Sequence, residues 1–236
     1  LADHAAIAIS NAQLYGEVQR ANVAKSEFVS FVAHELKNPM TPIKGFSDLL
    51  ASGAIGPINE NQAKFLATIR ANVDRMKTIV EDLNDDSKIA AGRMELKFKA
   101  VDVYDLVETV VRSNARQIEE KQQTLEVILP ENLPNIWADR VRTEQVLVNL
   151  VSNAHKYTPE GGHIILQAEK TANLWDAEGA KEVIHFWVKD DGYGINPEDQ
   201  KKIFTKFFRS PDEQARKSPG TGLGLNITKS LVEMQG

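Results

Sequence analysis

The chain has 236 residues, of which 42% are hydrophobic and 26% charged, an ordinary composition for a folded globular protein that excludes wholesale disorder. Its formal net charge of −5 gives no basic field over the whole protein, so we expect no nucleic-acid partner. Cysteine is absent, which excludes disulfides and zinc–thiolate sites. The sequence contains no run of about 18 apolar residues, so no membrane-spanning helix is predicted in it.

The first part of the chain predicts two long helices. Few helix breakers interrupt residues 5–50, and a cluster rich in glycine, proline and serine at 52–57 separates them from a second helical stretch. In that stretch, apolar residues recur at steps of 3, 4, 3, 4 and 3, typical of a bundle helix: Leu66, Ile69, Val73, Met76, Val80 and Leu83. Two helices with one apolar seam each cannot enclose a core, so residues 10–90 predict a helical hairpin that forms a four-helix bundle as a homodimer.

The rest of the chain predicts an α+β domain with a core of its own. Alternating apolar and polar residues predict four strands, at about 94–98, 125–129, 164–168 and 183–188. Helical periodicity predicts three helices, at about 103–120, 140–156 and 223–234. Residues 170–182 predict a surface loop between the last two strands.

One histidine of the first helix has neighbours that change its interpretation. The helix carries an apolar stripe at i, i+4 and i+8: Phe28, Val32 and Leu36. His34 projects away from that stripe, where a lone histidine is usually a solvated surface residue. Glu35 can orient or deprotonate the imidazole, and Asn38 lies one turn on, on the same face. Pro39 and Pro42 remove helical amide donors just beyond it, so we expect a bend below a functional imidazole.

A helix of the second domain aligns two amide side chains. Asn149 and Asn153, followed by Lys156 or Tyr157, fall on one face at i, i+4 and i+7 or i+8. Two neutral amide oxygens can ligate Mg²⁺ without the negative charge that would repel a triphosphate, and the lysine supplies a positive charge for phosphates. Taken alone, the same pattern also fits a polar helix surface.

A glycine-containing turn follows the last predicted strand. In the pattern Asp-x-Gly-x-Gly, the residues are Asp190, Gly192 and Gly194, with Ile195 next. A carboxylate can accept a hydrogen bond from the exocyclic amine of adenine, and the glycines let the backbone approach a ligand. Asp191 is the competing acid, although its spacing to the glycines does not fit the pattern.

A second glycine-rich segment opens the last predicted helix. After Pro219 it comprises Gly220, Thr221, Gly222, Leu223 and Gly224. Backbone amides at a helix N-terminus bind phosphate, so this segment predicts a phosphate contact. A flexible loop is the alternative.

These segments, in this order, resemble the motifs of sensor histidine kinases. Residues 34–39 resemble the H-box, residues 145–158 the N-box and residues 203–209 the F-box, and the likeness extends over about 22–236. The resemblance implies an all-α helical hairpin, a four-helix bundle as a homodimer, followed by an α+β sandwich of the GHKL type that binds ATP.

The resemblance also implies roles for the residues. His34 is the residue phosphorylated, Glu35 assists as a base, and Asn38 positions water when the protein dephosphorylates its partner. Arg209 contacts the γ-phosphate, and its aromatic neighbours pack a lid, whereas Lys206 is a solvated charge. ATP and Mg²⁺ are the implied cofactors, and the implied partners are a second copy of the chain and the receiver domain of a response regulator.

The same resemblance divides the chain. Residues 1–20 resemble the end of a GAF sensor domain that feeds a signalling helix, residues 21–91 the dimerisation and phosphotransfer domain, and residues 92–236 a catalytic domain truncated at its C-terminus. The chain has no initiator methionine and stops within a helical pattern, so we expect it to be part of a longer protein. We expect a cytoplasmic location for this segment; the full-length protein could be soluble or attached to a membrane.

Two other functions compete with histidine phosphorylation. A GHKL-type ATPase that hydrolyses ATP resembles this domain but carries a glutamate base where this chain has Asn149, and an amide cannot take a proton from water. A catalytically silent dimeric scaffold would not need the intact set of His34, both asparagines, Asp190 and the glycines.

Overall fold

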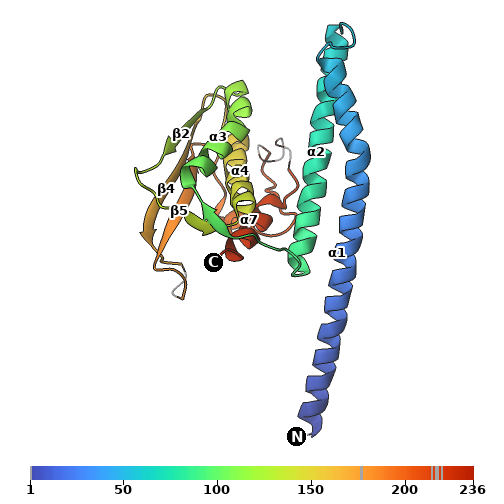
Figure 1. Cartoon of the computed structure of the whole chain (residues 1–236), viewed down its shortest axis with the longest axis vertical. Coiled ribbons are helices and arrows are strands. Elements are labelled where there is room, and N and C mark those ends of the chain that lie inside the picture. Colours follow the sequence, from blue (N-terminus) through green and yellow to red (C-terminus); the bar gives the residue numbers. More distant parts are fainter. Residues whose placement is uncertain (1, 176–177, 214, 216–217, 219) are drawn as a thin grey trace. The chain divides into compact units, whose positions relative to one another are not determined.

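The computed structural model describes residues 2–175, 178–213, 215, 218 and 220–236; it does not describe the side chains of Ala2, Asp3 and residues 5–9. The chain divides into two compact units, Leu1–Met94 and Glu95–Gly236 (Figure 1). The backbone around the predicted GAF-like segment is helical, but the alanine and isoleucine side chains that suggested it lie largely outside the described residues. None of the described helices has an apolar stretch long enough to cross a membrane.

The first unit is a helical hairpin. Helix α1 spans Ala2–Ala51 and α2 spans Glu60–Ala90. Helix α1 runs as one helix through Pro39 and Pro42, so the two prolines remove backbone hydrogen bonds without ending it. A capping box starts α2: the Asn59 side chain accepts from the Gln62 amide at 2.9 Å, and the Gln62 side chain accepts from the Asn59 amide at 2.8 Å.

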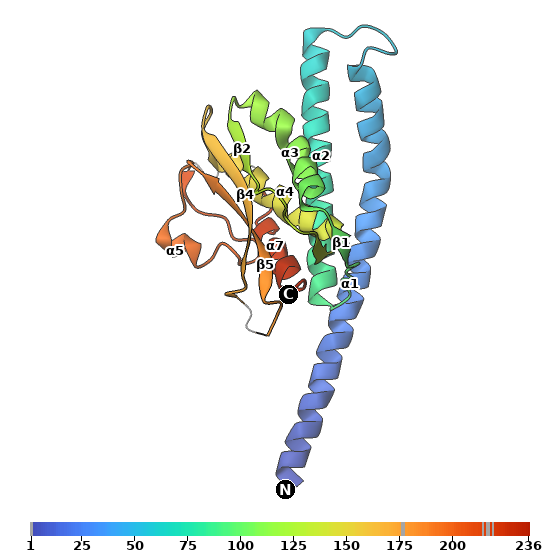
Figure 2. The ribbon, with the colours of Figure 1, turned by 60° about the vertical axis from the view of Figure 1, so that its left-hand side comes forward.

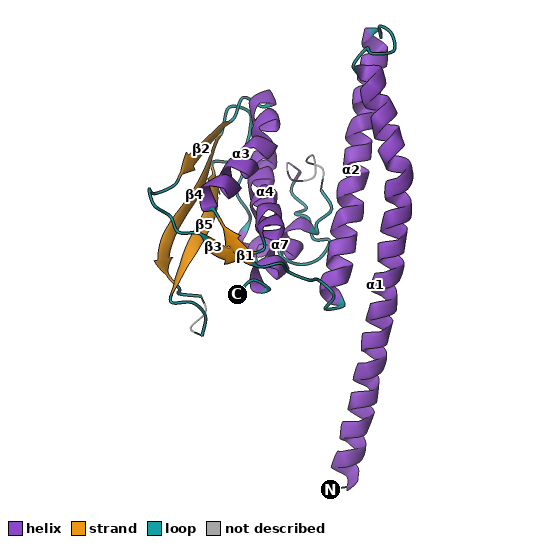
Figure 3. Ribbon diagram, viewed as in Figure 1, coloured by secondary structure: helices purple, strands orange, loops and turns teal. Residues whose placement is uncertain are grey.

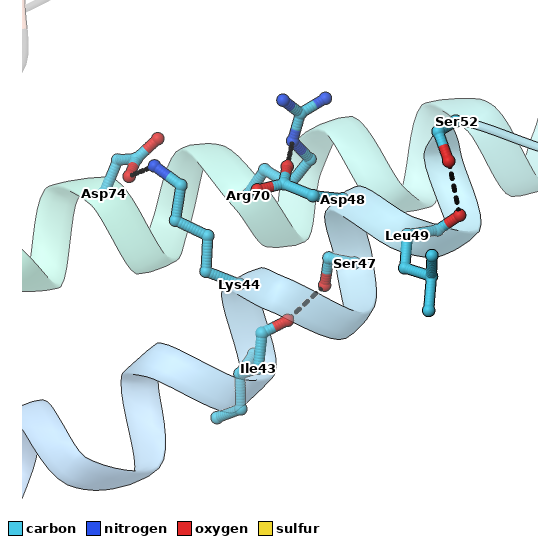
Figure 4. A network of polar contacts seen from close by, with 8 residues as sticks. All are labelled: Ile43, Lys44, Ser47, Asp48, Leu49, Ser52, Arg70 and Asp74. Carbon is cyan, nitrogen blue, oxygen red and sulfur yellow. Dashed lines mark hydrogen bonds and ion pairs between the residues drawn. The ribbon is translucent and has the colours of Figure 1, made fainter. Parts of the chain in front are cut away.

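Polar contacts between the helices define the register of the hairpin. Lys37 pairs with Glu81 at 3.0 Å, and Ser30 donates to Asn84 at 2.8 Å. Figure 4 shows two more pairs nearer the loop, Lys44 with Asp74 and Arg70 with Asp48. As the residue number increases along α1, the number of its partner on α2 decreases, so the two helices are antiparallel.

The predicted apolar seam of α2 divides into two faces. One face is buried in the hairpin and repeats every seven residues, with Leu66, Val73 and Val80 at exposures of 9%, 7% and 6%. The buried positions of α1 have the same repeat: Ser26, Ala33, Met40 and Ser47. The other half of the seam is exposed in this single chain, at Ile69, Met76 and Leu83. The expectation that the whole seam lacks a partner within one hairpin is therefore wrong for Leu66, Val73 and Val80.

The predicted stripe on α1 is not the buried face either. Phe28 is 66% exposed and Leu36 is 40% exposed, while Val32 is only half-buried. Small side chains at Ser26 and Ala33 occupy the contact instead. Phe28 and Leu36 lie on the exposed surface beside this contact.

The second unit layers helices on a mixed sheet. Strands β2 (Thr124–Ile128), β4 (His163–Ala172) and β5 (Glu182–Asp190) form the order β2-β4-β5, with β2 parallel and β5 antiparallel to β4. Helices α3 (Val103–Glu120), α4 (Arg140–Tyr157) and α7 (Gly224–Glu233) cover one face (Figure 3). The remaining elements are short: β1 (Lys99–Val101) pairs with β3 (Ile136–Ala138), and α5 (Pro197–Gln200) is one turn (Figure 2).

The core of this unit lies between that face of the sheet and the helices. Strand alternation buries Ile164, Leu166 and Ala168 of β4 completely. Against them pack buried residues of α3 and α4, including Leu106, Val110, Leu147 and Val151. The predicted fold class, a helical hairpin followed by an α+β domain, is confirmed.

Two predicted segments differ from the structure, and one strand was not predicted. Residues 94–98 form no strand; pairing begins only at Lys99, opposite Ala138 of a strand that we did not predict. The predicted loop at 170–182 is shorter, because β4 and β5 continue to the pair Ala172–Glu182. Lys170 and Glu182 form an ion pair at 2.7 Å across these strands. The polar residues that suggested a loop therefore belong to the paired ends of β4 and β5.

Candidate functional site

His34 lies on the surface of α1 with two polar side chains beside its imidazole. Its side chain is 73% exposed, and Nδ1 lies 3.3 Å from Glu35 Oε1 and 3.5 Å from Asn38 Nδ2. The shorter contact, to a carboxylate oxygen that can only accept, favours the tautomer in which Nδ1–H donates to Glu35; Asn38 Nδ2 is itself a donor and makes no hydrogen bond to Nδ1 in that tautomer. Nε2 then keeps its lone pair and has no hydrogen-bond partner among the described residues, so the exposed nitrogen is the nucleophilic one.

The remaining predicted residues lie in the second unit, where α4 either carries them or contacts the segments that do. Asp139 caps α4 by accepting from the Arg142 amide at 3.0 Å, and its other oxygen accepts from the Lys97 amide at 2.7 Å. Burial by itself would raise the pKa of Asp139, but the backbone hydrogen bonds from Lys97, Arg142 and Val141 outweigh it and hold the pKa below its usual range.

That pKa predicts an acid-sensitive start of α4. Because the folded pKa lies below the unfolded value of about 3.9, the stabilisation is present above that pH and is lost as the pH falls through the folded pKa. Asp139→Asn keeps a capping side chain without the charge, so it should cost about 1 kcal/mol at neutral pH. Urea unfolding should show this difference shrinking below about pH 4; a constant difference at all pH values would contradict the prediction.

Asn149 joins α4 to α7. Its Nδ2 donates to Thr228 Oγ1 at 2.8 Å, which leaves Oδ1 as the available oxygen. A Cβ at Gly224 would lie 2.6 Å from that oxygen, so any other residue there would displace the Asn149 amide. Asn153, one turn on, is half-buried and its side chain has no hydrogen-bond partner among the described residues. Two adjacent amide oxygens that the fold does not use fit the predicted magnesium ligands.

The Asp190 turn is seated on the end of α4. Tyr193 donates its amide to the Tyr157 carbonyl at 3.1 Å, and a Cβ at Gly192 would lie 2.4 Å from the same oxygen. Gly194 has a φ of 72°, a conformation that glycine adopts without strain. Ile195, which follows it, is 49% exposed.

The structure also separates the roles of the two competing aspartates. Asp191 Oδ1 accepts from the His163 amide at 2.8 Å, so this carboxylate holds the first residue of β4. Asp190 accepts only from Gly192 within the turn, at 2.9 Å, and its other oxygen has no partner among the described residues. The free oxygen supports Asp190 as the acceptor for a ligand.

The glycine-rich segment before α7 packs on residues 203–209. Gly222 has a φ of 73°, and a Cβ there would lie 2.7 Å from the backbone of Phe207. Leu223 donates its amide to Thr221 Oγ1 at 3.1 Å, while no side chain caps the first turn of α7. Gly220 has open space around its Cβ position. The glycine-rich segment therefore contacts two other predicted motifs, the N-box-like helix at Asn149 and the F-box-like segment at Phe207.

Arg209 faces the chain just before that segment. Its guanidinium donates to the carbonyl of Ser218 at 2.6 Å and to that of Ala215 at 3.3 Å. The predicted contact with a γ-phosphate would require these hydrogen bonds to be exchanged.

Sequence reasoning missed two residues that hold the end of α4. Lys121 Nζ donates to the carbonyls of His155 and Thr158 at 2.9 and 2.5 Å, and Gln123 Nε2 donates to Thr158 and Pro159 at 2.7 and 3.0 Å. No local pattern could have identified them, because the strands β2 and β3 and the loop between them separate both residues from α4 in the sequence. The only available signal was a general one: the last carbonyls of a helix need donors.

Comparisons with known proteins match a different family model to each of the two compact units. Residues 24–92 match the family described as His Kinase A (phospho-acceptor) domain, and residues 138–236 match the family described as Histidine kinase-, DNA gyrase B-, and HSP90-like ATPase. The chain is 35% identical over 219 residues to the Non-motile and phage-resistance protein of Caulobacter vibrioides, covering 92% of this chain and 25% of that protein. It is 32% identical over 263 residues to the Circadian input-output histidine kinase CikA of Synechococcus elongatus, covering 100% and 34%. The chain thus spans a quarter to a third of these relatives.

Solved structures have the same architecture. ShkA full-length in complex with AMPPNP matches with a TM-score of 0.65 and 25% identity, over 88% of this chain and 40% of that one. The histidine kinase ThkA in complex with response regulator protein TrrA matches with a TM-score of 0.54 and 27% identity, over 89% of this chain and 55% of that one.

Proposed function

This chain carries the phospho-acceptor and ATPase domains of the histidine kinase family, and from that premise we propose that it is the core of a sensor histidine kinase. It phosphorylates itself on His34 with ATP and passes the phosphoryl group to an aspartate of a response-regulator receiver. The observation that carries the proposal is the exposed imidazole whose Nδ1 faces Glu35, because this leaves Nε2 as the nucleophile.

The chemistry follows from the residues. Nε2 of His34 attacks the γ-phosphorus of ATP, the bond to the β–γ bridging oxygen breaks, and ADP leaves. Glu35 accepts the hydrogen bond from Nδ1–H and stabilises the positive charge that develops on the ring. Asn149 and Asn153 would hold Mg²⁺, which neutralises phosphate charge when bound. Catalysis here is mostly positioning.

The second unit supplies the nucleotide site in this proposal. Asp190 accepts from the adenine amine, with Gly192, Gly194 and Ile195 beside the ring, while Lys156 and Tyr157 end the helix that carries both asparagines. The glycine segment from Gly220 to Gly224 and Arg209 contact the phosphates. The neighbour solved with AMPPNP supports ATP as the ligand, and the neighbour solved with a response regulator supports the second partner.

The proposed division of the chain assigns residues 21–91 to dimerisation and phosphotransfer and residues 92–236 to catalysis. Residues 1–20 are the end of an upstream sensor domain or signalling helix. The exposed half of the α2 seam supports a homodimer, because large apolar side chains there have no cover in a single chain. A cytoplasmic location is part of the same proposal.

The direct test uses γ-labelled ATP. We expect the chain to acquire label that is lost in acid and retained in base, the stability expected of phosphohistidine. Inorganic phosphate released without labelled protein would indicate a GHKL-type ATPase, and neither product would indicate a silent scaffold.

Replacing the proposed adenine acceptor should weaken nucleotide binding. Asp190→Asn puts an amide where a carboxylate accepts, and losing a charge-assisted hydrogen bond should weaken affinity by about tenfold to a hundredfold. Calorimetric titration measures this. A larger loss in Asp191→Asn, with Asp190→Asn unchanged, would mean that Asp191 is the acceptor.

Asn38 separates two activities. Its amide lies beside His34 and can hold water in line with the aspartyl phosphate of a docked regulator. We expect Asn38→Ala to keep most autophosphorylation and to lose phosphatase activity by about tenfold or more. Glu35→Ala should show the opposite bias. Phospho-regulator decay and label uptake distinguish them, and unchanged decay with Asn38→Ala would leave Asn38 as a solvated helix residue.

A further inference from the structure

One turn of the chain, residues 155–159 at the end of α4, supports three parts of the proposed nucleotide site. It carries the Lys156 side chain, and its Tyr157 carbonyl accepts from the Tyr193 amide of the Asp190 turn at 3.1 Å. The Lys156 carbonyl also accepts from Ser218 Oγ, in the segment before α7, at 3.4 Å. A displacement of this turn therefore moves the phosphate-binding lysine and both flanking segments together.

Two side chains from outside α4 hold that turn. Lys121, at the end of α3, and Gln123, just before β2, donate to its carbonyls, and the two share those of His155 and Thr158. Gln123 is 7% exposed, and its Oε1 lies 2.7 Å from His155 Nδ1, so it contacts the turn as both donor and acceptor. Tyr157 lies between these residues, and its carbonyl is left for Tyr193.

We propose that Lys121 and Gln123 are positioning residues for nucleotide binding, which hold the 155–159 turn in the conformation that presents Lys156 and seats the Asp190 turn. This inference rests on the proposed function. Neither side chain needs to touch the nucleotide, because each acts through the carbonyls of the turn.

An ordinary helix end would not require this arrangement. Water satisfies the last carbonyls of an exposed helix without desolvating a charge. Here burial lowers the pKa of Lys121, with Glu160 opposing the change, so the ammonium is partly removed from water to reach these oxygens. The carbonyls at a helix C-terminus attract a cation, which offsets that cost.

The test compares nucleotide affinity with stability. Lys121→Met keeps the apolar stem but removes every donor, Lys121→Arg restores charge and donors, and Lys181→Met removes an exposed lysine elsewhere in the same unit. Binding of AMPPNP is measured by calorimetry at a temperature where circular dichroism shows each variant folded. We expect Lys121→Met to weaken binding about tenfold or more, Lys121→Arg to stay within about threefold, and Lys181→Met to be unchanged.

A lower melting temperature with parental AMPPNP affinity in Lys121→Met would overturn the inference, since that is the result of a purely structural contact. If Lys121→Met does not fold, Gln123→Glu serves instead: it keeps the acceptor for His155 but turns a carboxylate oxygen toward the carbonyls, and the same loss of affinity is expected. Parental affinity in that variant would equally overturn it. A parent chain that does not bind AMPPNP would overturn the proposed function as well.

Discussion

His34→Gln is expected to take up no phosphoryl group from γ-labelled ATP while it binds nucleotide as tightly as the parent chain. Glutamine keeps a polar side chain on the exposed face of α1 but has no ring nitrogen that can attack phosphorus. Affinity should not change, because every residue proposed to bind nucleotide belongs to the unit Glu95–Gly236. Acid-labile protein label and AMPPNP calorimetry measure the two properties.

His163→Gln is the matched control. His163 is also an exposed histidine beside a carboxylate, with Nε2 at 3.0 Å from Glu126 Oε2 and a side chain 43% exposed. Its substitution should leave the label intact. Label that persists on His34→Gln, or disappears in His163→Gln alone, would remove His34 from the mechanism.

Glutamate at two neighbouring positions of α2 should have two different effects. Met76 is 47% exposed on the uncovered half of the seam, so Met76→Glu should leave the hairpin folded and dissociate the proposed dimer. Val73 is 7% exposed inside the hairpin, so Val73→Glu should bury an unpaired charge and unfold it. Light scattering measures the mass and circular dichroism the helix content.

Ala71→Glu provides the control for helix propensity and charge, because Ala71 is exposed and lies outside both apolar faces of α2. It should remain folded and dimeric. A parent chain that is monomeric at tens of micromolar would contradict the proposed dimer. A Met76→Glu variant that remains dimeric would mean that the interface lies on a different surface.

Local patterns were sufficient to predict the helices and to select the candidate motif residues. The period of the α2 seam and the polarity around His34 depend on residues a few positions apart, so both could be predicted without a fold. The same holds for Asn149 and Asn153, which share a face because of helix geometry alone. The strand boundaries were less accurate, because pairing such as Lys99 with Ala138 depends on a distant partner.

The sequence by itself determined the two-part architecture and selected His34 as the candidate for phosphorylation and a set of candidate residues for nucleotide binding, since each depends on residue type at short spacing. Tertiary packing decided which half of the α2 seam is buried, because Val73 and Met76 are equally apolar and only the approach of α1 separates them. It also distinguished the two aspartates: β4–β5 pairing sets Asp190 opposite Ile164, so Asp191 reaches the His163 backbone and Asp190 keeps a free oxygen. Lys121 and Gln123 reached the end of α4 only through that same packing, which joins segments more than thirty residues apart.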